Sequence, residues 1–423
     1  MWRGERAHRS GRRLWAGAIV LALVAAACGG GDDSADVTAE ADPAEEVVVS
    51  AIDVVPGMFP VLDADNIYSE TGPGGLSPSV ADDPRRVYVP NHASDNVTVI
   101  DQITKEVIST VPSGGSRPQH VVPSWDMETL WIANNSELDH AAGTLRGING
   151  TTATLADPVS VPDPYNVYFS ADGTYGIVVA EGLQRLDFYD AQFNSVQFTI
   201  ATPMCPGINH ADFSADGTYV IFTCEFAGSM LKISAPNGDW ANAVVSEPLV
   251  LSGGGQPQDV RTSPDGKVFY VAEMNQGRVY LIDGESFTEM GFLDAGDGVG
   301  VGTHGLYPSW DHKLYVINRG APSLSEAGPN GPGSVSVFDI SDTAAPELIA
   351  KVDVPGGGSP DMGNFSTDGT ELWLGGRYDN VVYVFDIENL EWEATIDAGA
   401  EPHGLAVWPL PGRYSLGHTG NVR

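Results

Sequence analysis

Histidine and carboxylate side chains recur at two fixed places ahead of a repeated Ser-x-Asp motif. Five residues before the motif's Ser, or before Trp408 in the last unit, stand Gln119, Tyr165, Asn209, Gln258, His304, Asp361 and His403. Four residues before it stand His120, Asn166, His210, Asp259, Gly305, Met362 and Gly404. We call these places position five and position four. The sequence has nine His, and four of them fall on these fourteen places.

Two candidate ligand sets follow from this pattern. His304, Asp361 and His403 share position five in three successive units, and two imidazoles with one carboxylate suit a transition metal. The second set, at position four, is His120, His210 and Asp259. Adjacent residues of a strand point to opposite faces, so the two sets can point to opposite sides of their strands. The alternative role for these histidines is structural hydrogen bonding or contact with a small ligand.

Polar and charged residues also recur near the end of the second strand of each unit. The ring at this place consists of Asn91, Asn134, Glu181, Glu225, Glu273, Asn318 and Arg377. The loops after second strands open at the same end as the starts of first strands, so we expect these side chains at the same mouth. Glu181, Glu225 and Glu273 with Arg377 suit a cation or a polar substrate. The alternative is a solvated acidic rim.

The elements that must position these side chains are short strands. The Asp residues of the motif are Asp126, Asp172, Asp216, Asp265, Asp311 and Asp368, with spacings of 46, 44, 49, 46 and 57. Asp-Gly favours a hairpin turn because Gly adopts positive φ without steric cost. A second, a third and a short fourth strand follow in most units. Four strands repeated about seven times, without a helical stretch, predict an all-β propeller of four-stranded blades.

The number of blades has two solutions. Residues 403–408 supply one inner strand and residues 87–111 supply three outer strands, which gives seven blades with the N- and C-terminal strands in one blade. The eight-bladed alternative needs strands at 76–81, 414–418 and 47–53. Prolines and glycines make 76–81 a weak strand, so seven blades are favoured.

Two segments resemble a known repeat. Val87-Tyr88-Val89-Pro90-Asn91, followed by Asn96-Val97-Thr98-Val99-Ile100-Asp101, is similar to the YVTN-type propeller repeat, and so is Pro402-His403-Gly404-Leu405-Ala406-Val407. The resemblance runs from about residue 76 to 408. Propellers related to this repeat include YncE-like proteins, lactonase-like proteins and the haem-binding propeller of nitrite reductases. The resemblance implies the fold more strongly than the function, because this fold hosts many activities.

The first residues are typical of an export signal. Five Arg precede an apolar run from Leu14 to Ala27, which is too short to span a bilayer. Small residues before Cys28 resemble a bacterial lipoprotein processing site, in which Cys28 becomes lipidated; an ordinary signal peptide is the alternative. The Arg12-Arg13 pair leaves the export route open. The expected organisation is a lipoprotein signal peptide at 1–27, a flexible acidic tether at 28–46 and one propeller domain at 47–423. We expect an exported protein, anchored by lipid to the cell membrane on its extracytoplasmic side.

Charge and cysteine content exclude some functions. Lys+Arg 21 against Asp+Glu 56 gives a net charge of −35, and removing five Arg and one Glu with residues 1–27 gives −39. Nucleic acid would be repelled by such a surface. The sequence contains no Cys-x-x-Cys-His, so no covalently attached haem is expected. Cys205 and Cys224 lie nearly opposite in a predicted hairpin, and export permits a disulfide between them; the alternative is two free buried thiols.

Two functions remain open. We expect a monomeric, membrane-anchored binding or scaffold propeller whose channel-mouth face takes a protein or a small-molecule ligand. The alternative is an enzyme or redox protein that uses the His and Asp ring with a transition metal or another cofactor, similar to lactonase-like hydrolases or the nitrite-reductase propeller. The sequence does not fix catalytic residues or the identity of the cofactor. Convergence of His304, Asp361 and His403 on one point would favour the alternative.

Overall fold

The computed structural model describes residues 52–295, 302–320 and 333–423. The predicted signal peptide, the acidic tether and Cys28 lie outside these residues, as do residues 47–51 of the predicted propeller domain. Among the described residues, no helix is both long and apolar enough to cross a membrane.

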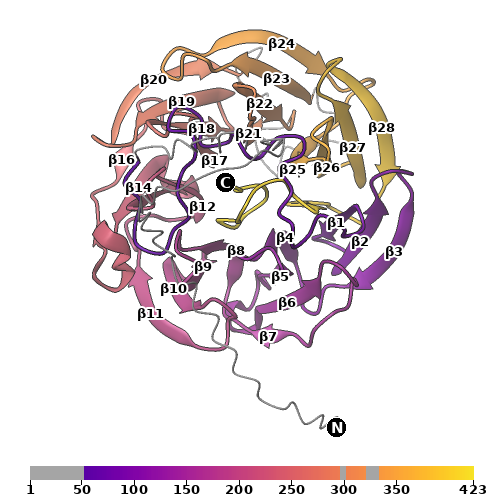
Figure 1. The fold of residues 1–423 in the computed structure, drawn as a ribbon, viewed down its shortest axis with the longest axis horizontal. Helices are drawn as coiled ribbons and strands as arrows, with labels where there is room; N and C mark the ends of the chain where they lie inside the picture. Colours follow the sequence, from indigo (N-terminus) through magenta and orange to yellow (C-terminus); the bar gives the residue numbers. More distant parts are fainter. Residues whose placement is uncertain (1–51, 296–301, 321–332) are drawn as a thin grey trace, which may run out of the picture. The chain divides into compact units, whose positions relative to one another are not determined.

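Within these ranges the strands form seven antiparallel sheets. Figure 1 shows the sheets arranged in a ring, and the space that their inner strands enclose is called the channel below. From the channel outward, the first three sheets are β29 (Ala406–Trp408), β1 (Arg86–Asn91), β2 (Asn96–Asp101), β3 (Val107–Pro112); β4 (Pro118–Pro123), β5 (Thr129–Asn134), β6 (Thr144–Asn149), β7 (Val159–Ser160); and β8 (Pro164–Phe169), β9 (Tyr175–Ala180), β10 (Arg185–Asp190), β11 (Val196–Ala201). The fourth is β12 (Ile208–Phe213), β13 (Tyr219–Cys224), β14 (Ser229–Ser234), with β15 (Val244–Val245) and β16 (Leu249–Val250) both paired to β14.

The last three sheets are β17 (Pro257–Thr262), β18 (Val268–Glu273), β19 (Arg278–Asp283), β20 (Thr288–Asp294); β21 (Thr303–Pro308), β22 (Lys313–Asn318), β23 (Ser334–Asp339), β24 (Glu347–Asp353); and β25 (Pro360–Phe365), β26 (Glu371–Gly376), β27 (Val381–Asp386), β28 (Glu391–Asp397). Four single-turn 3-10 helices also occur in the described chain, at His140–Ala142, Glu225–Ala227, Pro236–Gly238 and Trp240–Asn242. The prediction of an all-β propeller is confirmed.

Burial falls from the channel to the rim of each blade. All six residues of the inner strand β4 are buried, whereas five of the six residues of the outer strand β3 are exposed. The second and third strands are apolar on both faces because each sheet packs against two neighbouring blades. Leu130 of β5 and Val99 of β2 belong to one such core between adjacent blades. Apolar surface of one blade is therefore covered only by the next blade.

The ring closes in one blade that is built from both ends of the domain. β29 pairs antiparallel with β1, and Val407 lies opposite Val87. This arrangement confirms seven blades with the N- and C-terminal strands in one sheet. The eight-bladed alternative is wrong: Leu76 makes only isolated bridges to Pro411 and Gly412, and residues 414–418 lie along the channel instead of in an outer blade.

The Ser-x-Asp motifs form the turns between first and second strands, at one end of the channel. In the β8–β9 turn, Ser170 Oγ donates a hydrogen bond of 2.6 Å to Asp172 Oδ1. The Ser170 Oγ also accepts from the N–H of Tyr175 at 2.9 Å, and Gly173 adopts φ +71°, where a side chain would be strained. Equivalent Ser-to-Asp hydrogen bonds recur in five other blades. These local contacts explain why the motif predicts the turns correctly.

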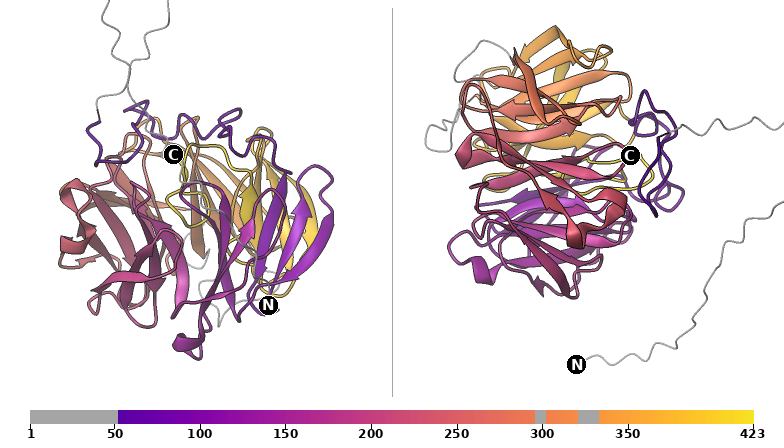
Figure 2. Two further views of the ribbon diagram at one scale, coloured as in Figure 1. Left: turned by 60° about the horizontal axis from the view of Figure 1, so that its bottom comes forward. Right: turned by 90° about the vertical axis from the view of Figure 1, so that its left-hand side faces the viewer.

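Two irregular segments cover this turn end of the ring. Residues 52–80 run across the turns: Val55 N–H donates to Asp216 O at 2.9 Å and Ile67 N–H to Pro264 O at 2.8 Å. Residues 409–423, called the tail below, enter the channel itself. Figure 2 shows residues 52–80 in indigo along one face, with the C-terminus beside them. Among the described residues, neither of these segments covers the opposite end of the channel.

The predicted disulfide is confirmed. Cys205 and Cys224 are bonded, with a Cα–Cα distance of 4.8 Å. Cys224 ends β13, and Cys205 lies in the loop before β12, so the bond ties the entry of the fourth blade to its own hairpin.

Candidate functional site

A cavity of about 580 Å³ opens at the end of the channel opposite the Ser-x-Asp turns. Its walls come from the starts of inner strands and from the residues that follow second strands. Position five contributes Gln119, Tyr165, Gln258, His304 and His403. The loops after second strands contribute Asn135, Glu181, Glu225, Met274, Arg319 and Arg377. His403 precedes β29 of the closing blade, so the cavity is lined by residues of all seven blades.

Both histidine positions face the channel because the inner strands are irregular at this point. Pairing of the inner strand with the second strand shifts register between Thr303 and Leu306, and the same shift occurs in the other inner strands that start a blade. Such an irregularity rotates neighbouring side chains away from strict alternation. The idea that positions four and five point to opposite sides is therefore wrong: the ring centroids of His120 and His403 are 4.9 Å apart.

His304, Asp361 and His403 lie together on the channel side of the cavity. One ligand atom from each lies within 4.8 Å of the other two. His304 Nδ1 is 2.8 Å from Asp361 Oδ1, and His403 Nε2 is 3.6 Å from Asp361 Oδ2. His403 Nδ1 lies 3.1 Å from the carbonyl oxygen of Gln119, so it carries the ring proton and leaves Nε2 as an acceptor. The arrangement could hold a transition metal.

A second histidine cluster lies deeper in the channel and differs from the predicted set. His120 of β4 and His210 of β12 meet His418 of the tail, again with ligand atoms within 4.8 Å of one another. Asp259 does not belong to this group. Its Oδ2 accepts hydrogen bonds from Arg261 Nε at 3.2 Å and from the N–H of Leu306 at 3.0 Å. Asp259 is thus a structural partner of a buried arginine.

The channel imidazoles are held in their neutral form by burial. Burial lowers the pKa of His120 from 6.5 to about 3 and the pKa of His304 to about 4. The pKa values of His210, His403 and His418 also fall well below 6.5, with burial as the largest cause. Neutral imidazole is the form that donates a lone pair to a metal.

Two arginines lie beside the first cluster. Arg319 Nη2 donates to Asp361 Oδ1 at 2.8 Å, and its charge helps to hold the pKa of Asp361 well below the usual range. Arg377 also lines the cavity and is only 4% exposed. Its Nε and Nη1 have no hydrogen-bond partner among the described residues. Arg377 is therefore a buried cation in the cavity wall, with two donor nitrogens that no described residue accepts.

The opposite wall of the cavity is made of carboxyl groups. Burial raises the pKa of Glu181 well above its usual value, and the neighbouring Glu225 raises it further. Burial also raises the pKa of Glu225, which accepts a hydrogen bond from Asn209 Nδ2 at 2.9 Å. Glu137 behaves differently, because its hydrogen bond to His92 lowers its pKa. The cavity thus has a cationic wall and an acidic wall.

Three residues of the predicted ring after second strands line the cavity, and the other four are the last residues of their strands. Glu181, Glu225 and Arg377 directly follow β9, β13 and β26, and all three line the cavity. Glu273 is the last residue of β18, and its carboxylate accepts N–H groups of the adjoining loops, including Gln276 at 2.9 Å. A shift of one residue turns a side chain away from the mouth.

Sequence reasoning missed Arg319 and His418. Arg319 follows β22 directly, so a count from strand ends would have placed it beside Arg377. No repeat pattern marks His418, because it lies in the tail. Its N–H donates to Val167 O at 2.9 Å, which fixes the ring inside the channel.

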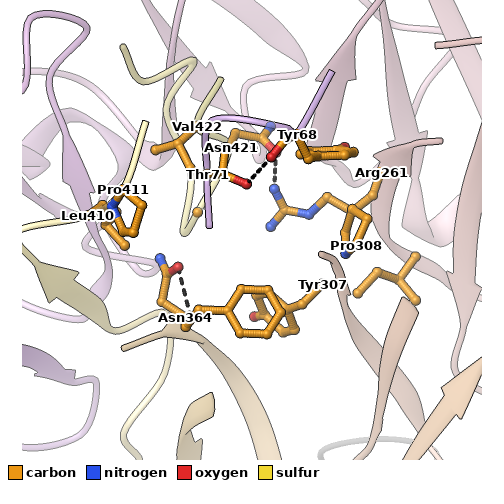
Figure 3. Close-up of a pocket in the computed structure, with 13 residues that line it drawn as sticks. Tyr68, Thr71, Arg261, Tyr307, Pro308, Asn364, Leu410, Pro411, Asn421 and Val422 are labelled. Carbon is orange, nitrogen blue, oxygen red and sulfur yellow. Dashed lines mark hydrogen bonds between the residues drawn. The ribbon is translucent and has the colours of Figure 1, made fainter. Parts of the chain in front are cut away.

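A much smaller void lies at the closed end of the channel. It measures about 20 Å³ and is lined by Tyr68, Arg261, Tyr307, Asn364 and Asn421, among others. Figure 3 shows Arg261 reaching toward Asn421 of the tail, to which it is hydrogen-bonded. A space of this size holds about one water molecule. The void is therefore part of the packing of the closed end, and the open cavity is the candidate site.

Comparison of the sequence with protein-family models and with curated proteins finds no match. Solved structures share the fold. The periplasmic gluconolactonase PpgL of Pseudomonas aeruginosa matches with TM-score 0.61 and 17% identity, over 77% of this chain and 99% of that chain. The dihydro-haem d1 dehydrogenase NirN, in complex with DHE, matches with TM-score 0.53 and 15% identity, over 81% of each chain. Hydrazine synthase of Kuenenia stuttgartiensis matches with TM-score 0.53 and 16% identity, over 68% of this chain and 88% of that chain. At these identities the likeness establishes the propeller fold.

Proposed function

We propose that this propeller binds a small polar molecule with an acidic group in its channel-mouth cavity. The observation that carries the proposal is the guanidinium of Arg377, which is buried in the cavity wall with two donor nitrogens unpartnered within the described chain. A buried charge without a partner is unfavourable, and a ligand carboxylate or phosphate would accept both hydrogen bonds. Arg319 lines the same cavity, where its charge is paired with the carboxylate of Asp361.

The acidic wall extends the expected ligand chemistry. Burial shifts the pKa values of Glu181 and Glu225 upward, toward a carboxyl form that donates a hydrogen bond and also accepts one. Hydroxyl groups match such partners. The cavity volume of about 580 Å³ lies in the range of small-molecule sites. A hydroxylated carboxylate or phosphate therefore fits both walls.

The predicted export signal and the predicted lipidation of Cys28 determine the proposed cellular location of this binding site. The ligand would be met on the extracytoplasmic side of the cell membrane, by a protein held to the surface through its N-terminal lipid. The strong negative charge of the chain steers anions away from most of the surface, so the two arginines would select the ligand locally.

Binding is tested by calorimetry with gluconate, citrate and inorganic phosphate as probes. We expect at least one probe to bind and Arg377→Gln to weaken it about tenfold or more, since a charge-assisted pair is lost. Arg146→Gln is the matched control, because Arg146 lies outside the cavity and bonds the backbone of Ala156. Equal affinity in both variants, or no binding of any probe, would contradict the proposal.

A second candidate function is hydrolysis of a lactone or similar ester at the same cavity. The observation that favours it is the convergence of His304, Asp361 and His403, where Asp361 Oδ2 has no hydrogen-bond partner in the described part of the chain. A metal ion held there would act as a Lewis acid and lower the pKa of a bound water. Arg377 would stabilise negative charge on the carbonyl oxygen under attack.

Turnover of glucono-1,5-lactone distinguishes the two functions. Hydrolysis above the spontaneous rate that is abolished by a chelator and by His403→Asn would establish the enzyme. Binding of gluconate without turnover, in protein supplied with Zn²⁺, Mn²⁺ or Ca²⁺, would leave the binding function alone.

A further inference from the structure

We propose that His120, His210 and His418 form a separate transition-metal site within the channel, and that its ion holds the tail in place. This proposal does not depend on the function of the cavity. The three ligands come from β4, β12 and the tail, which are distant in sequence and meet only in the closed ring.

The three rings are positioned as a closed site. Ring centroids lie 4.6 Å apart for His210 and His418, 5.2 Å for His120 and His418, and 5.5 Å for His120 and His210. Each residue is 0% exposed. Zinc–imidazole bonds of about 2.0–2.1 Å place ligand nitrogens about 3.4 Å apart in a tetrahedron, so small ring rotations complete the site.

Two of these rings have nitrogen atoms that no described residue satisfies. His120 Nδ1 lies 2.9 Å from the carbonyl oxygen of Tyr165, so Nδ1 carries the proton and Nε2 offers a lone pair. The Nε2 atoms of His120 and His210 find no hydrogen-bond partner among the described residues. Buried polar atoms without partners destabilise a fold, and a metal ion would satisfy both.

Asn166 is placed to orient the other two ligands. Its Nδ2 lies 2.7 Å from His418 Nδ1 and 3.3 Å from His210 Nδ1. A metal-bound imidazole carries its proton on the nitrogen away from the ion and needs an acceptor there. Rotation of the amide by half a turn brings Oδ1 to these nitrogens in exchange for the 2.8 Å hydrogen bond that Oδ1 accepts from the N–H of Val167, and the ring protons move from Nε2 to Nδ1. No proton is released from either ring in this rearrangement.

The donor set limits the identity of the ion. Three imidazoles without a carboxylate suit Zn²⁺, Co²⁺, Ni²⁺ or copper and exclude Ca²⁺ and Mg²⁺, which need oxygen ligands. Asp259 Oδ1, 3.6 Å from His418 Nε2, supplies a nearby negative charge. Asp259 also forms an ion pair with Arg261 and is not one of the three ligands, so its negative charge only helps to balance the positive charge of the ion.

The test is metal stoichiometry in the full chain, purified without a histidine tag. Co²⁺ and Zn²⁺ are titrated into the protein in a His403→Asn background, which removes the ligand set at the cavity. We expect one tight equivalent that is lost on adding His418→Asn and retained on adding His312→Asn, a histidine in the β21–β22 turn. Equal metal content in these two variants, or no tight equivalent before them, would overturn the proposal.

Asn166 variants separate a ligand-orienting role from a structural one. Asn166→Asp supplies a permanent acceptor and is expected to raise metal affinity about tenfold, whereas Asn166→Leu lowers it by a similar factor. Unchanged affinity in both would remove the orienting role. If His418→Asn does not fold, X-ray absorption of the Zn²⁺-loaded His403→Asn protein decides: three imidazole ligands support the site, and an oxygen-dominated shell refutes it. If His418→Asn still binds the probes at the cavity, the proposed metal site and the proposed ligand binding can be judged independently.

Discussion

The neutral channel histidines make the stability of this protein sensitive to mild acid. The pKa of His120 is 6.5 in an ordinary environment and about 3 in the fold. Below pH 6.5 the unfolded chain takes up a proton that the folded chain refuses, so acid favours unfolding. The contribution of His120 is fully present above pH 6.5 and is lost progressively between pH 6.5 and about 3.

The size of this effect follows from the pKa difference. From pH 6.5 to pH 5, a span of about 1.5 pH units, the unfolded state binds a proton that the folded state does not. At about 1.4 kcal/mol per pH unit, the free energy of unfolding falls by about 2 kcal/mol for one imidazole. His304, with a pKa of about 4, contributes a similar amount over the same interval. Asp259 opposes them, because burial raises its pKa to about 6 and acid stabilises its folded form. A difference between variants is therefore needed to isolate one histidine.

Urea unfolding at pH 7 and pH 5, followed by tryptophan fluorescence in the presence of EDTA, supplies that difference. Between pH 7 and pH 5, the free energy of unfolding of His120→Asn should fall by about 2 kcal/mol less than that of the native chain. The same difference is expected for His304→Asn. The control is His312→Asn, outside the channel, which should keep the native pH dependence. Identical pH dependence in all four proteins would refute the neutral-ring argument and remove the chemical basis of both metal sites.

Three further changes test the packing around the site. Reducing the bond between Cys205 and Cys224, which are 19 residues apart, should lower the free energy of unfolding by about 3 kcal/mol in urea, and an unchanged midpoint would contradict this. Gly404→Ala would place a methyl group 2.1 Å from Cδ2 of His120 and should cost about 1–3 kcal/mol; an unshifted melting temperature would show that the channel is loosely packed. Arg261→Met leaves a buried aspartate unpaired and should cost about 3–5 kcal/mol by the same melting assay, where a loss under about 1 kcal/mol would refute the pairing.

The fold is predictable from sequence because its signals are local. Each Ser-x-Asp turn is fixed by contacts within five residues, as Ser170 shows with Asp172 and Tyr175. The same locality fixes the disulfide, since Cys224 ends the second strand of the hairpin that Cys205 enters. Sequence reasoning could therefore count strands, locate turns and close the ring.

The geometry of the site is less predictable because it depends on register and on the tail. Strict alternation separates His403 from His120, yet the irregular inner strands bring both to the channel. Glu273 is the last residue of its strand and does not line the cavity, whereas Arg319 is the first residue after its strand and does. His418 reaches its cluster through pairing of the tail with β8, a contact that no periodicity encodes.

The blade that is built from both ends of the domain also sets the order in which the strands pair when the chain folds. Val87 and Val407 pair across 320 residues (407 − 87), whereas Val87 and Ile100 pair across 13 (100 − 87). Closing the longer loop costs about 3 kcal/mol more in chain entropy. We therefore expect the other strands to assemble first, while the inner edge of β1 waits without a partner. An unpaired edge invites pairing with a second copy of the chain, so the last strand to arrive is also the one that prevents aggregation.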